Sequence, residues 1–296
     1  MTDRMKLEGS MVALVTPFSG GQVDYEALGR LIDFQMEGGT QALIPCGTTG
    51  ESPTLSYDEH DKVIEFTVER AGGRVPVIAG TGSNSTAEAV RLTKHAKDAG
   101  ADACLVVNPY YNKPTQHGMF EHVQRLAEVQ LPIVLYNIPG RTGIELAAET
   151  IVRMYNEIEM VVAVKEATGK LDMASAIAAA CDITILSGDD SLTLPIGSVG
   201  GSGVISVLAN ILPGEVRKLC DAMNAGDMKA AREQHLRLFG LFKAIFVETN
   251  PIPIKAAMAM AGMIRNELRL PLTALSSEHR EPLAKLLEPF GLKMAV

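Results

Sequence analysis

The chain contains the run Val161-Val162-Ala163-Val164-Lys165, in which four apolar residues end in a lysine. Small and β-branched residues in an unbroken run predict a parallel strand that is buried on both faces. A lysine at the end of such a strand is unusual, because burying an ammonium group is costly and favours loss of its proton. A shielded neutral amine is the nucleophile that forms Schiff bases with ketones. Lys165 is therefore a candidate nucleophile, and the alternative is an ion pair with a carboxylate at the same end of the sheet.

Seven other apolar runs accompany this one and complete a set of candidate strands. Their bounds are Met11–Thr16, Ala42–Pro45, Val75–Gly80, Ala103–Val107, Ile133–Asn137, Ile183–Ser187 and Val204–Val207. The segments between most of them carry helix signals. Ser56-x-x-Glu59 and Ser85-x-x-Glu88 fit the capping box, in which side chains bond the free amides of a first helical turn. Asp24 is placed to cap another helix, so strand and helix alternate along the chain.

Eight buried strands that alternate with helices over roughly 220 residues predict a (β/α)8 TIM barrel, a fold of the α/β class. The competing open, doubly wound sheet usually has fewer strands. Its dinucleotide fingerprint GxGxxG is absent after the first strand, where Thr16-Pro17-Phe18 follows. Beyond Pro213 the sequence predicts helices only, with cores at Asp227–Phe246, Pro253–Ala261 and Glu281–Leu287. We expect a catalytic barrel over residues 1–224 and a C-terminal helical extension over residues 225–296.

Composition excludes several classes of protein. The net charge is −8, from 27 basic and 35 acidic residues among 296, which argues against a nucleic-acid surface. The four cysteines are scattered without a CxxC pair, and Met1 to Ser10 resembles neither a signal nor a transit peptide, so we expect a reduced, cytoplasmic protein. The uncharged stretch Ser191–Gly214 is long enough to span a bilayer. Its prolines and glycines favour a helix, a loop and a strand instead, and we expect no membrane partner.

Polar residues follow the ends of several predicted strands. They form four segments, which are Cys46-Gly47-Thr48-Thr49-Gly50-Glu51-Ser52, Asn108-Pro109-Tyr110-Tyr111-Asn112, Tyr136-Asn137-Ile138-Pro139-Gly140-Arg141-Thr142-Gly143 and Ser187-Gly188-Asp189-Asp190. Active sites of (β/α)8 barrels lie at the carboxyl ends of the strands and in the loops that follow. These segments and Lys165 are therefore predicted to converge on one mouth of the barrel.

Each of these candidates has a simpler interpretation. Thr48 and Thr49 lie between glycines, which fits a turn as well as a close approach of backbone amides to an anion. Tyr136 ends an apolar run, where a tyrosine is usually a core residue with one satisfied hydroxyl. Arg141 follows a strand in a Pro-Gly turn, where a solvated arginine is the default. Beside a nucleophilic lysine, its guanidinium becomes a clamp for a carboxylate.

A metal site is not predicted. Asp189-Asp190 is the one acidic pair at a strand end, but no histidine lies near any predicted strand end and magnesium would need further carboxylates. We expect this pair to give hydrogen-bonding support. The glycines from Gly197 to Gly203 fit a phosphate loop after the last strands, close packing, or a carboxylate site.

Six motifs occur in a characteristic order. They are GTTGES (47–52), NPYYNKP (108–114), YNIPGRTG (136–143), VKEATG (164–169), SGDD (187–190) and GVISV (203–207). Taken together, they resemble the dihydrodipicolinate synthase family, which belongs to the N-acetylneuraminate lyase superfamily of class I aldolases. The resemblance extends from about Gly9 to the C-terminal helices and includes the segment Pro251-Ile252-Pro253-Ile254-Lys255.

The resemblance implies a reaction and an assignment of residues. The reaction is the Schiff-base aldol condensation of pyruvate with L-aspartate 4-semialdehyde to 4-hydroxy-tetrahydrodipicolinate, the first committed step of diaminopimelate and lysine biosynthesis. The resemblance assigns the imine to Lys165 and proton transfer at the imine carbon to Tyr136. It assigns a hydroxyl relay to Thr48 and to Tyr111, which reaches in from a neighbouring subunit.

Substrate binding is implied for three further residues. Thr49 and the backbone of Ile205 match pyruvate ligands, and Arg141 matches the residue that binds the carboxylate of the semialdehyde. No metal or organic cofactor is implied, because the iminium is itself the electron sink. The nearest rivals are other pyruvate aldolases of the superfamily, namely N-acetylneuraminate lyases and 2-keto-3-deoxy sugar acid aldolases or dehydratases. Thr48-Thr49 together with Arg141 favours the synthase, whereas a non-catalytic pyruvate-binding barrel would lack a relay residue.

The resemblance also implies assembly and regulation. Two adjacent aromatic residues, Tyr110 and Tyr111, stand in a polar loop, and a homotetramer built from tight dimers is expected. Five residues match an inhibitory L-lysine site of the family, which are Ser52, His60, Asn84, Glu88 and Tyr110. Pro53 and Tyr57 stand where lysine-sensitive members have a small residue and a histidine. We therefore expect weak or partial inhibition by lysine.

Overall fold

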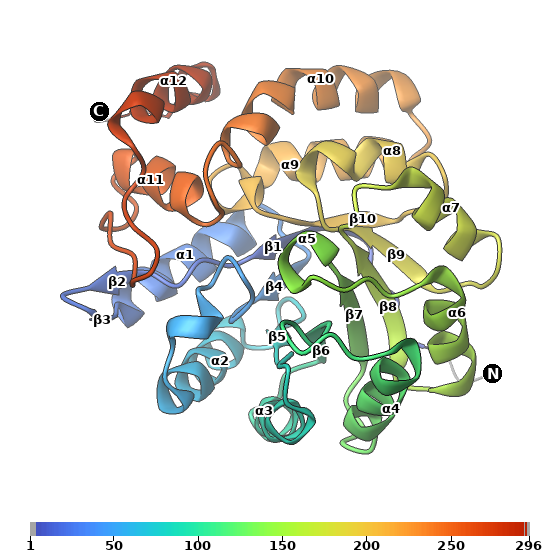
Figure 1. The fold of residues 1–296 in the computed structure, drawn as a ribbon. Coiled ribbons are helices and arrows are strands. Elements are labelled where there is room, and N and C mark those ends of the chain that lie inside the picture. The colour runs from blue at the N-terminus through green and yellow to red at the C-terminus, as the bar shows by residue number, and fades with distance from the viewer. Residues whose placement is uncertain (1–3, 293, 295–296) are drawn as a thin grey trace.

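A computed structural model describes residues 4–292 and 294 of the chain. Its principal sheet has eight parallel strands in the order β4-β1-β10-β9-β8-β7-β6-β5. These strands are β1 (Gly9–Ala13), β4 (Ala42–Ile44), β5 (Ile78–Gly80), β6 (Ala103–Val107), β7 (Ile133–Asn137), β8 (Val161–Glu166), β9 (Thr184–Ser187) and β10 (Gly203–Ser206). A parallel bridge between Leu43 and Val77 joins β4 to the start of β5 and closes the ring. The predicted (β/α)8 barrel is confirmed, with its strands gathered at the centre of Figure 1.

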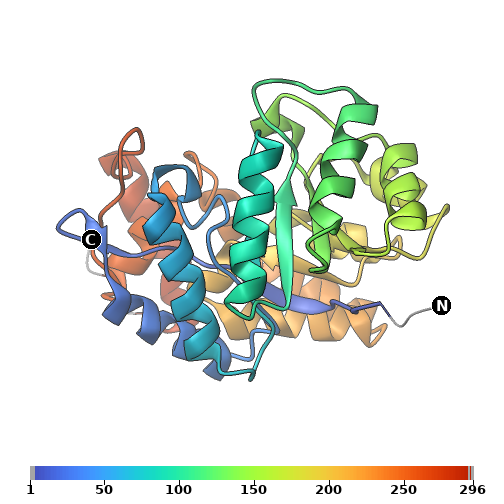
Figure 2. The same cartoon turned by 90° about the horizontal axis from the view of Figure 1, so that it is seen from below.

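Helices surround the sheet. They are α1 (Tyr25–Glu37), α2 (Tyr57–Ala71), α3 (Thr86–Asp98), α4 (Gln116–Ala127), α5 (Pro139–Thr142), α6 (Ala148–Glu157), α7 (Leu171–Ala178), α8 (Thr193–Gly197), α9 (Pro213–Asn224), α10 (Met228–Ala244), α11 (Ile252–Met260) and α12 (Ser277–Leu287). Short 3-10 turns lie at Ser52–Thr54, Asp190–Leu192, Leu208–Asn210 and Glu288–Phe290, and a small hairpin is formed by β2 (Phe18–Ser19) and β3 (Gln22–Val23). Seen from below, α1 to α4 lie side by side around the outside of the sheet (Figure 2).

All eight predicted strands are present; two have the predicted bounds, four differ by one residue at one or both ends, and the first and third differ by more. The first begins at Gly9 and ends at Ala13, because beyond it the amide of Val15 is bonded by the side chain of Asn210 instead of a neighbouring strand. The third begins only at Ile78. Pro76, which precedes it, has no amide to donate to a ladder.

One of the two predicted capping boxes forms. Ser56 and Glu59 bond each other's backbone amides at the start of α2, as predicted. The prediction of a capping box at Ser85 and Glu88 is wrong. Ser85 precedes α3 without a side-chain cap, and the Glu88 carboxylate is instead bonded by the hydroxyls of Ser83 and Tyr57. The glutamate is thus turned away from the helix end toward the neighbouring loop and α2. Asp24 caps α1 through the amide of Ala27, as expected.

The apolar residues form two clusters that the sheet separates. The larger lies between the sheet and the helices, and the smaller fills the inside of the barrel with residues such as Met11, Ile44, Val134 and Leu186. Each strand is therefore buried on both faces, which explains the unbroken apolar runs of the sequence.

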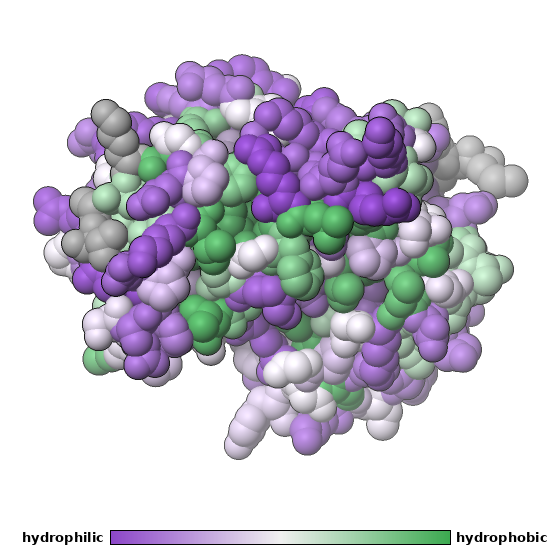
Figure 3. All heavy atoms as spheres, turned by 90° about the horizontal axis from the view of Figure 1, so that it is seen from above, coloured by the Kyte–Doolittle hydropathy of each residue, from purple (hydrophilic) through white to green (hydrophobic). Residues whose placement is uncertain are grey.

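The last helices pack beside the barrel. α10 contacts α9 and α12, and α11 contacts α12, so the predicted C-terminal helices are present. Polar side chains dominate their outer face, with small apolar areas between them (Figure 3). The uncharged stretch from Ser191 to Gly214 folds as helix α8, strand β10 and the start of α9. In the described residues, no helix has the length and apolar character needed to cross a membrane.

Candidate active site

Lys165 and Tyr136 lie next to each other at the carboxyl ends of adjacent strands. They are paired in the register of β7 and β8. Lys165 is 5% exposed, and its Nζ lies 4.2 Å from the centre of the Tyr136 ring. Because alternate residues of a strand face opposite sides, Glu166 points away from this lysine and bonds Thr168. The strand thus delivers one amine to the inside of the barrel mouth.

Burial changes the acidity of both groups. It lowers the pKa of Lys165 to about 8, although the carboxylates of Asp190 and Asp189 oppose this shift. It raises the pKa of Tyr136 to about 12, against the charge of Arg141 and a hydrogen bond from Thr48. A substantial fraction of the lysine is therefore neutral near pH 8, whereas the tyrosine keeps its proton. This is the combination needed for an amine nucleophile beside a hydroxyl that moves protons.

The loop after β4 brings two threonines to this lysine. Both Thr48 and Thr49 line a cavity of about 60 Å³ that also touches Lys165 and Tyr136. Thr49 is buried, and its hydroxyl accepts a hydrogen bond of 3.0 Å from the Asn250 side chain. The threonines thus contact the cavity around the amine, as predicted.

Arg141 lies in the short helix after β7. It is exposed, lines the same small cavity, and donates from Nη2 to the backbone carbonyl of Asn250 at 3.1 Å. A guanidinium at the rim, with further donors free of this bond, can bind a carboxylate of a ligand in the cavity.

The two neighbouring aspartates, Asp189 and Asp190, have different surroundings. Asp190 is buried and accepts from the Ser206 hydroxyl and, at 2.9 Å, from the amide of Val207. Burial raises the pKa of Asp190 to about 6 despite these bonds. Asp190 therefore ties β10 to the loop after β9, in agreement with the expected supporting role. Asp189 is partly exposed and lines the cavity beside Lys165.

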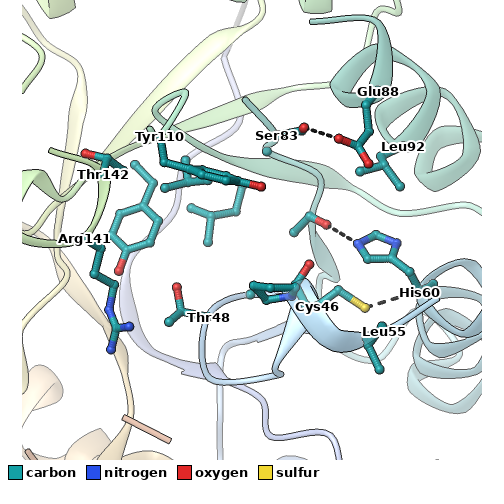
Figure 4. A pocket seen from close by; sticks show the side chains of 18 of the residues that line it. Cys46, Thr48, Leu55, His60, Ser83, Glu88, Leu92, Tyr110, Arg141 and Thr142 are labelled. Atoms are coloured by element: carbon teal, nitrogen blue, oxygen red, sulfur yellow. Dashed lines mark hydrogen bonds between the residues drawn. The ribbon is translucent and has the colours of Figure 1, made fainter. Parts of the chain in front are cut away.

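A larger cavity of about 640 Å³ adjoins the site and shares Gly47, Thr48, Tyr136 and Arg141 with the smaller one. Figure 4 shows Arg141 and Thr48 on one side of this space and Glu88 and His60 on the other, with Tyr110 between them. The cavity therefore extends from the candidate catalytic residues to a second group of polar residues.

Four of the five residues predicted for a lysine site line this larger cavity. They are Ser52, His60, Glu88 and Tyr110. His60 is buried, bonds the Gly80 carbonyl at 3.0 Å, and has its pKa lowered by burial. The fifth, Asn84, is not among the lining residues, and its carbonyl accepts from Asn112.

Two of the predicted catalytic and substrate-binding residues are not among those that line the small cavity. The Tyr111 side chain is 90% exposed, and its backbone has a left-handed φ of +74°. A non-glycine residue held in this conformation often marks a functional position. Ile205 lies in β10, fully buried in the inner cluster, and Val207, two residues further on, lines the small cavity.

Sequence reasoning missed the contribution of the C-terminal segment. The ammonium of Lys255 pairs with Glu51 at 2.5 Å, and both side chains are fully buried. Glu51 has a left-handed φ of +53° in the loop that carries Thr48 and Thr49. The lysine within the apolar run from Pro251 to Met260 was the available signal, but nothing in the sequence locates its partner. In residues 4–292 and 294, no cluster of three or more His, Cys, Asp or Glu side chains is arranged to hold a metal ion.

The fold and the buried amine define a (β/α)8-barrel protein with the side chains of a Schiff-base-forming enzyme at its mouth. Residues 6–289 match the model of the Dihydrodipicolinate synthetase family, and the chain belongs to this family.

Relatives named 4-hydroxy-tetrahydrodipicolinate synthase are similar to this chain over almost their whole length. The 4-hydroxy-tetrahydrodipicolinate synthase of Aquifex aeolicus is 53% identical over 97% of this chain and 99% of its own. That of Citrifermentans bemidjiense is 54% identical over 96% of this chain and 99% of its own.

Two crystal structures agree with this result. The dihydrodipicolinate synthase of Aquifex aeolicus superposes with a TM-score of 0.96 and 52% identity, over 98% of this chain and 100% of its own. The chloride-inhibited enzyme of Acinetobacter baumannii in complex with pyruvate has a TM-score of 0.94 and 44% identity, over 97% and 100%. The family predicted from the six motifs is confirmed.

Proposed function

We propose that this chain condenses pyruvate with L-aspartate 4-semialdehyde to 4-hydroxy-tetrahydrodipicolinate, in diaminopimelate and lysine biosynthesis. The observation that carries the proposal is the buried Lys165 amine beside the Tyr136 ring at the barrel mouth. Relatives more than 50% identical carry the name of the synthase, which favours this reaction over the sugar-acid aldolases of the superfamily.

The first half of the reaction uses the neutral amine. Lys165 adds to the ketone carbon of pyruvate, and loss of the oxygen as water leaves a cationic imine. Tyr136 donates and recovers the protons that this exchange requires, because its high pKa keeps the hydroxyl protonated. Thr49 and the backbone of Ile205 hold the pyruvate carboxylate. The cationic imine then takes up the electrons of a methyl C–H bond, the proton leaves through the hydroxyl of Tyr136, and an enamine forms.

The second half forms the new carbon–carbon bond. The enamine carbon attacks the aldehyde of the semialdehyde, whose carboxylate is held by Arg141. The aldehyde oxygen takes a proton through the hydroxyls of Tyr136, Thr48 and Tyr111. The amino group of the adduct then adds to the imine carbon, and the Lys165 amine leaves, so the ring closes as the enzyme is regenerated.

Assembly completes the relay in this proposal. Tyr111 has a side chain that is almost fully exposed, which fits a role in the site of a neighbouring subunit. We therefore propose a homotetramer built from tight dimers, which acts in the cytoplasm. Ser52, His60, Asn84, Glu88 and Tyr110 are proposed to form an L-lysine site, and all of them except Asn84 line the larger cavity.

Borohydride trapping tests the reaction. Reduction in the presence of pyruvate should add a pyruvyl mass to the peptide that contains Lys165. A label on another lysine would overturn the assignment. A substrate panel then separates the synthase from its relatives. Faster cleavage of N-acetylneuraminate or of a 2-keto-3-deoxy sugar acid than condensation with the semialdehyde would overturn the proposed function.

A further inference from the structure

We infer that Asn250 is a positioning residue that makes the Thr49 hydroxyl a hydrogen-bond donor toward the substrate carboxylate. The inference rests on the proposed function, since it takes pyruvate as the ligand of Lys165. It assigns a role in substrate recognition to the segment between α10 and α11, outside the barrel strands.

The contact that carries the inference joins two buried side chains. Asn250 and Thr49 are 5% and 2% exposed, and Nδ2 of the amide donates to Oγ1 of the hydroxyl at 3.0 Å. Both residues line the small cavity around Lys165. The amide oxygen of Asn250 is buried without a hydrogen-bond partner among the described residues. Leaving such an atom unpaired costs free energy, which indicates that the amide is held for its donor end.

The chemistry follows from the proton count of a hydroxyl. A threonine hydroxyl has one proton to donate and two lone pairs that accept. The amide N–H of Asn250 occupies one lone pair, so the Thr49 proton is turned toward another acceptor. A carboxylate only accepts, and a hydrogen bond to it is stronger than one between neutral groups. Asn250 therefore selects an anionic ligand over an uncharged one.

A second contact places the same residue beside the other carboxylate-binding side chain. Nη2 of Arg141 donates to the Asn250 backbone carbonyl at 3.1 Å. Five residues further on, Lys255 is fixed by its buried pair with Glu51, in the same loop as Thr49. Asn250 is thus anchored on both sides, and its amide is held at a fixed place relative to Thr49 and Arg141.

The test replaces the donor by an acceptor of the same shape. Asn250→Asp should turn the Thr49 proton away from the ligand and place a negative charge beside it. We expect the pyruvate concentration that gives half-maximal borohydride trapping on Lys165 to rise about tenfold or more. For methyl pyruvate, an uncharged ester, the change should stay below about threefold. Asn250→Ala adds no charge. It should raise the pyruvate concentration for half-maximal trapping roughly three- to tenfold, as expected for one lost hydrogen bond.

Two comparisons control the result. Asn224→Asp makes the same substitution at an exposed asparagine that bonds the Ser202 carbonyl, and it should trap pyruvate as the unmodified chain does. In a Thr49→Val background, Asn250→Ala should not change the pyruvate concentration for half-maximal trapping any further, because the hydroxyl that Asn250 orients is gone.

The outcomes separate this inference from the proposed function. Equal weakening of trapping with pyruvate and with its ester would mean that Asn250 only supports the loop, and no weakening would mean that it has no role. Either result overturns the inference. If Asn250→Asp does not fold, the comparison of the two ligands is made with Asn250→Ala. Failure of the unmodified chain to trap pyruvate would instead overturn the proposed function.

Discussion

The Lys255 ammonium and the Glu51 carboxylate form an ion pair, 2.5 Å long, in which neither side chain reaches solvent. The ammonium also bonds the Thr16 carbonyl at 3.0 Å and lies 4.3 Å from the centre of the Phe18 ring. The second carboxylate oxygen accepts from the amide of Arg269 at 3.1 Å. The pair therefore fastens the loop after β4 to α11 and to the segment that follows it.

Breaking this pair on one side should be strongly destabilising. Lys255→Met leaves the Glu51 carboxylate buried without its counter-charge, which costs about 3–5 kcal/mol of folding free energy. Urea unfolding followed by circular dichroism measures the loss. Lys285→Met is the matched control, because Lys285 pairs with Glu281 at the surface and should leave the midpoint nearly unchanged. Similar losses in both variants would contradict the importance of the buried pair.

Imine formation should follow the titration of Lys165. The pKa of this amine is lowered to about 8, and only the deprotonated form attacks a ketone. At pH 7 about a tenth of the amine is neutral, so the trapping rate at limiting pyruvate should rise about fivefold from pH 7 to pH 8 and level off above about pH 9. An unperturbed lysine would give a rate that still rises at pH 10. A plateau that begins only there would show that burial does not tune this group.

Removal of the Tyr136 hydroxyl should affect chemistry and spare the fold. Tyr136→Phe keeps the ring against Lys165, and turnover should fall about a hundredfold or more, as loss of a general acid or base does. Thr48→Val should lower turnover in the same direction but less. Initial rates with both substrates, together with unfolding midpoints, check this prediction. Turnover near that of the unmodified chain would reduce the tyrosine to a packing residue.

Arg141→Ala should separate the two substrates. The guanidinium lies at the rim of the cavity, so its loss should raise KM for the semialdehyde about tenfold or more, as expected for a lost charge-assisted contact. Trapping with pyruvate alone should largely survive. A matched control is Arg125→Ala, whose side chain pairs with Glu128 at the surface and should change neither value. A loss of pyruvate trapping as large as the loss of semialdehyde use would place Arg141 elsewhere in the reaction.

Inhibition by L-lysine should be weak or partial. The Tyr57 hydroxyl bonds one oxygen of Glu88 at 2.6 Å, and Ser83 bonds the other, so an incoming ammonium group must displace a partner. Tyr57→Phe frees one oxygen and should therefore strengthen inhibition. Lysine titrations of initial rate at fixed pyruvate compare the two chains. Complete inhibition of the unmodified chain at low micromolar lysine would show that Tyr57 and Pro53 do not matter.

The sequence predicts the barrel well because a strand that is buried on both faces has apolar residues at every position. Each strand is an unbroken apolar run, and Lys165 interrupts the pattern at the position where the mouth begins. Contacts between side chains that are far apart in the sequence produce no such pattern. Glu51 and Lys255 are about 200 positions apart, and the spacing of residues says nothing about their contact. Glu88 shows the opposite failure. Its capping motif is complete in sequence, but the folded chain brings the hydroxyls of Tyr57 and Ser83 to the carboxylate, and they bond it in place of the helix amide.

The closure of the barrel between β4 and β5 has a consequence for aggregation. This seam is the single bridge of Leu43 with Val77, flanked by backbone bonds to the carbonyls of Pro76 and Pro45. Neither proline can donate to the ladder, so the seam has fewer hydrogen bonds than a regular strand pair. If the ring opens, it opens here first, and two short edge strands become available to other chains. Prolines on both edges then act as gatekeepers, since they make each edge a poor template for adding a foreign strand.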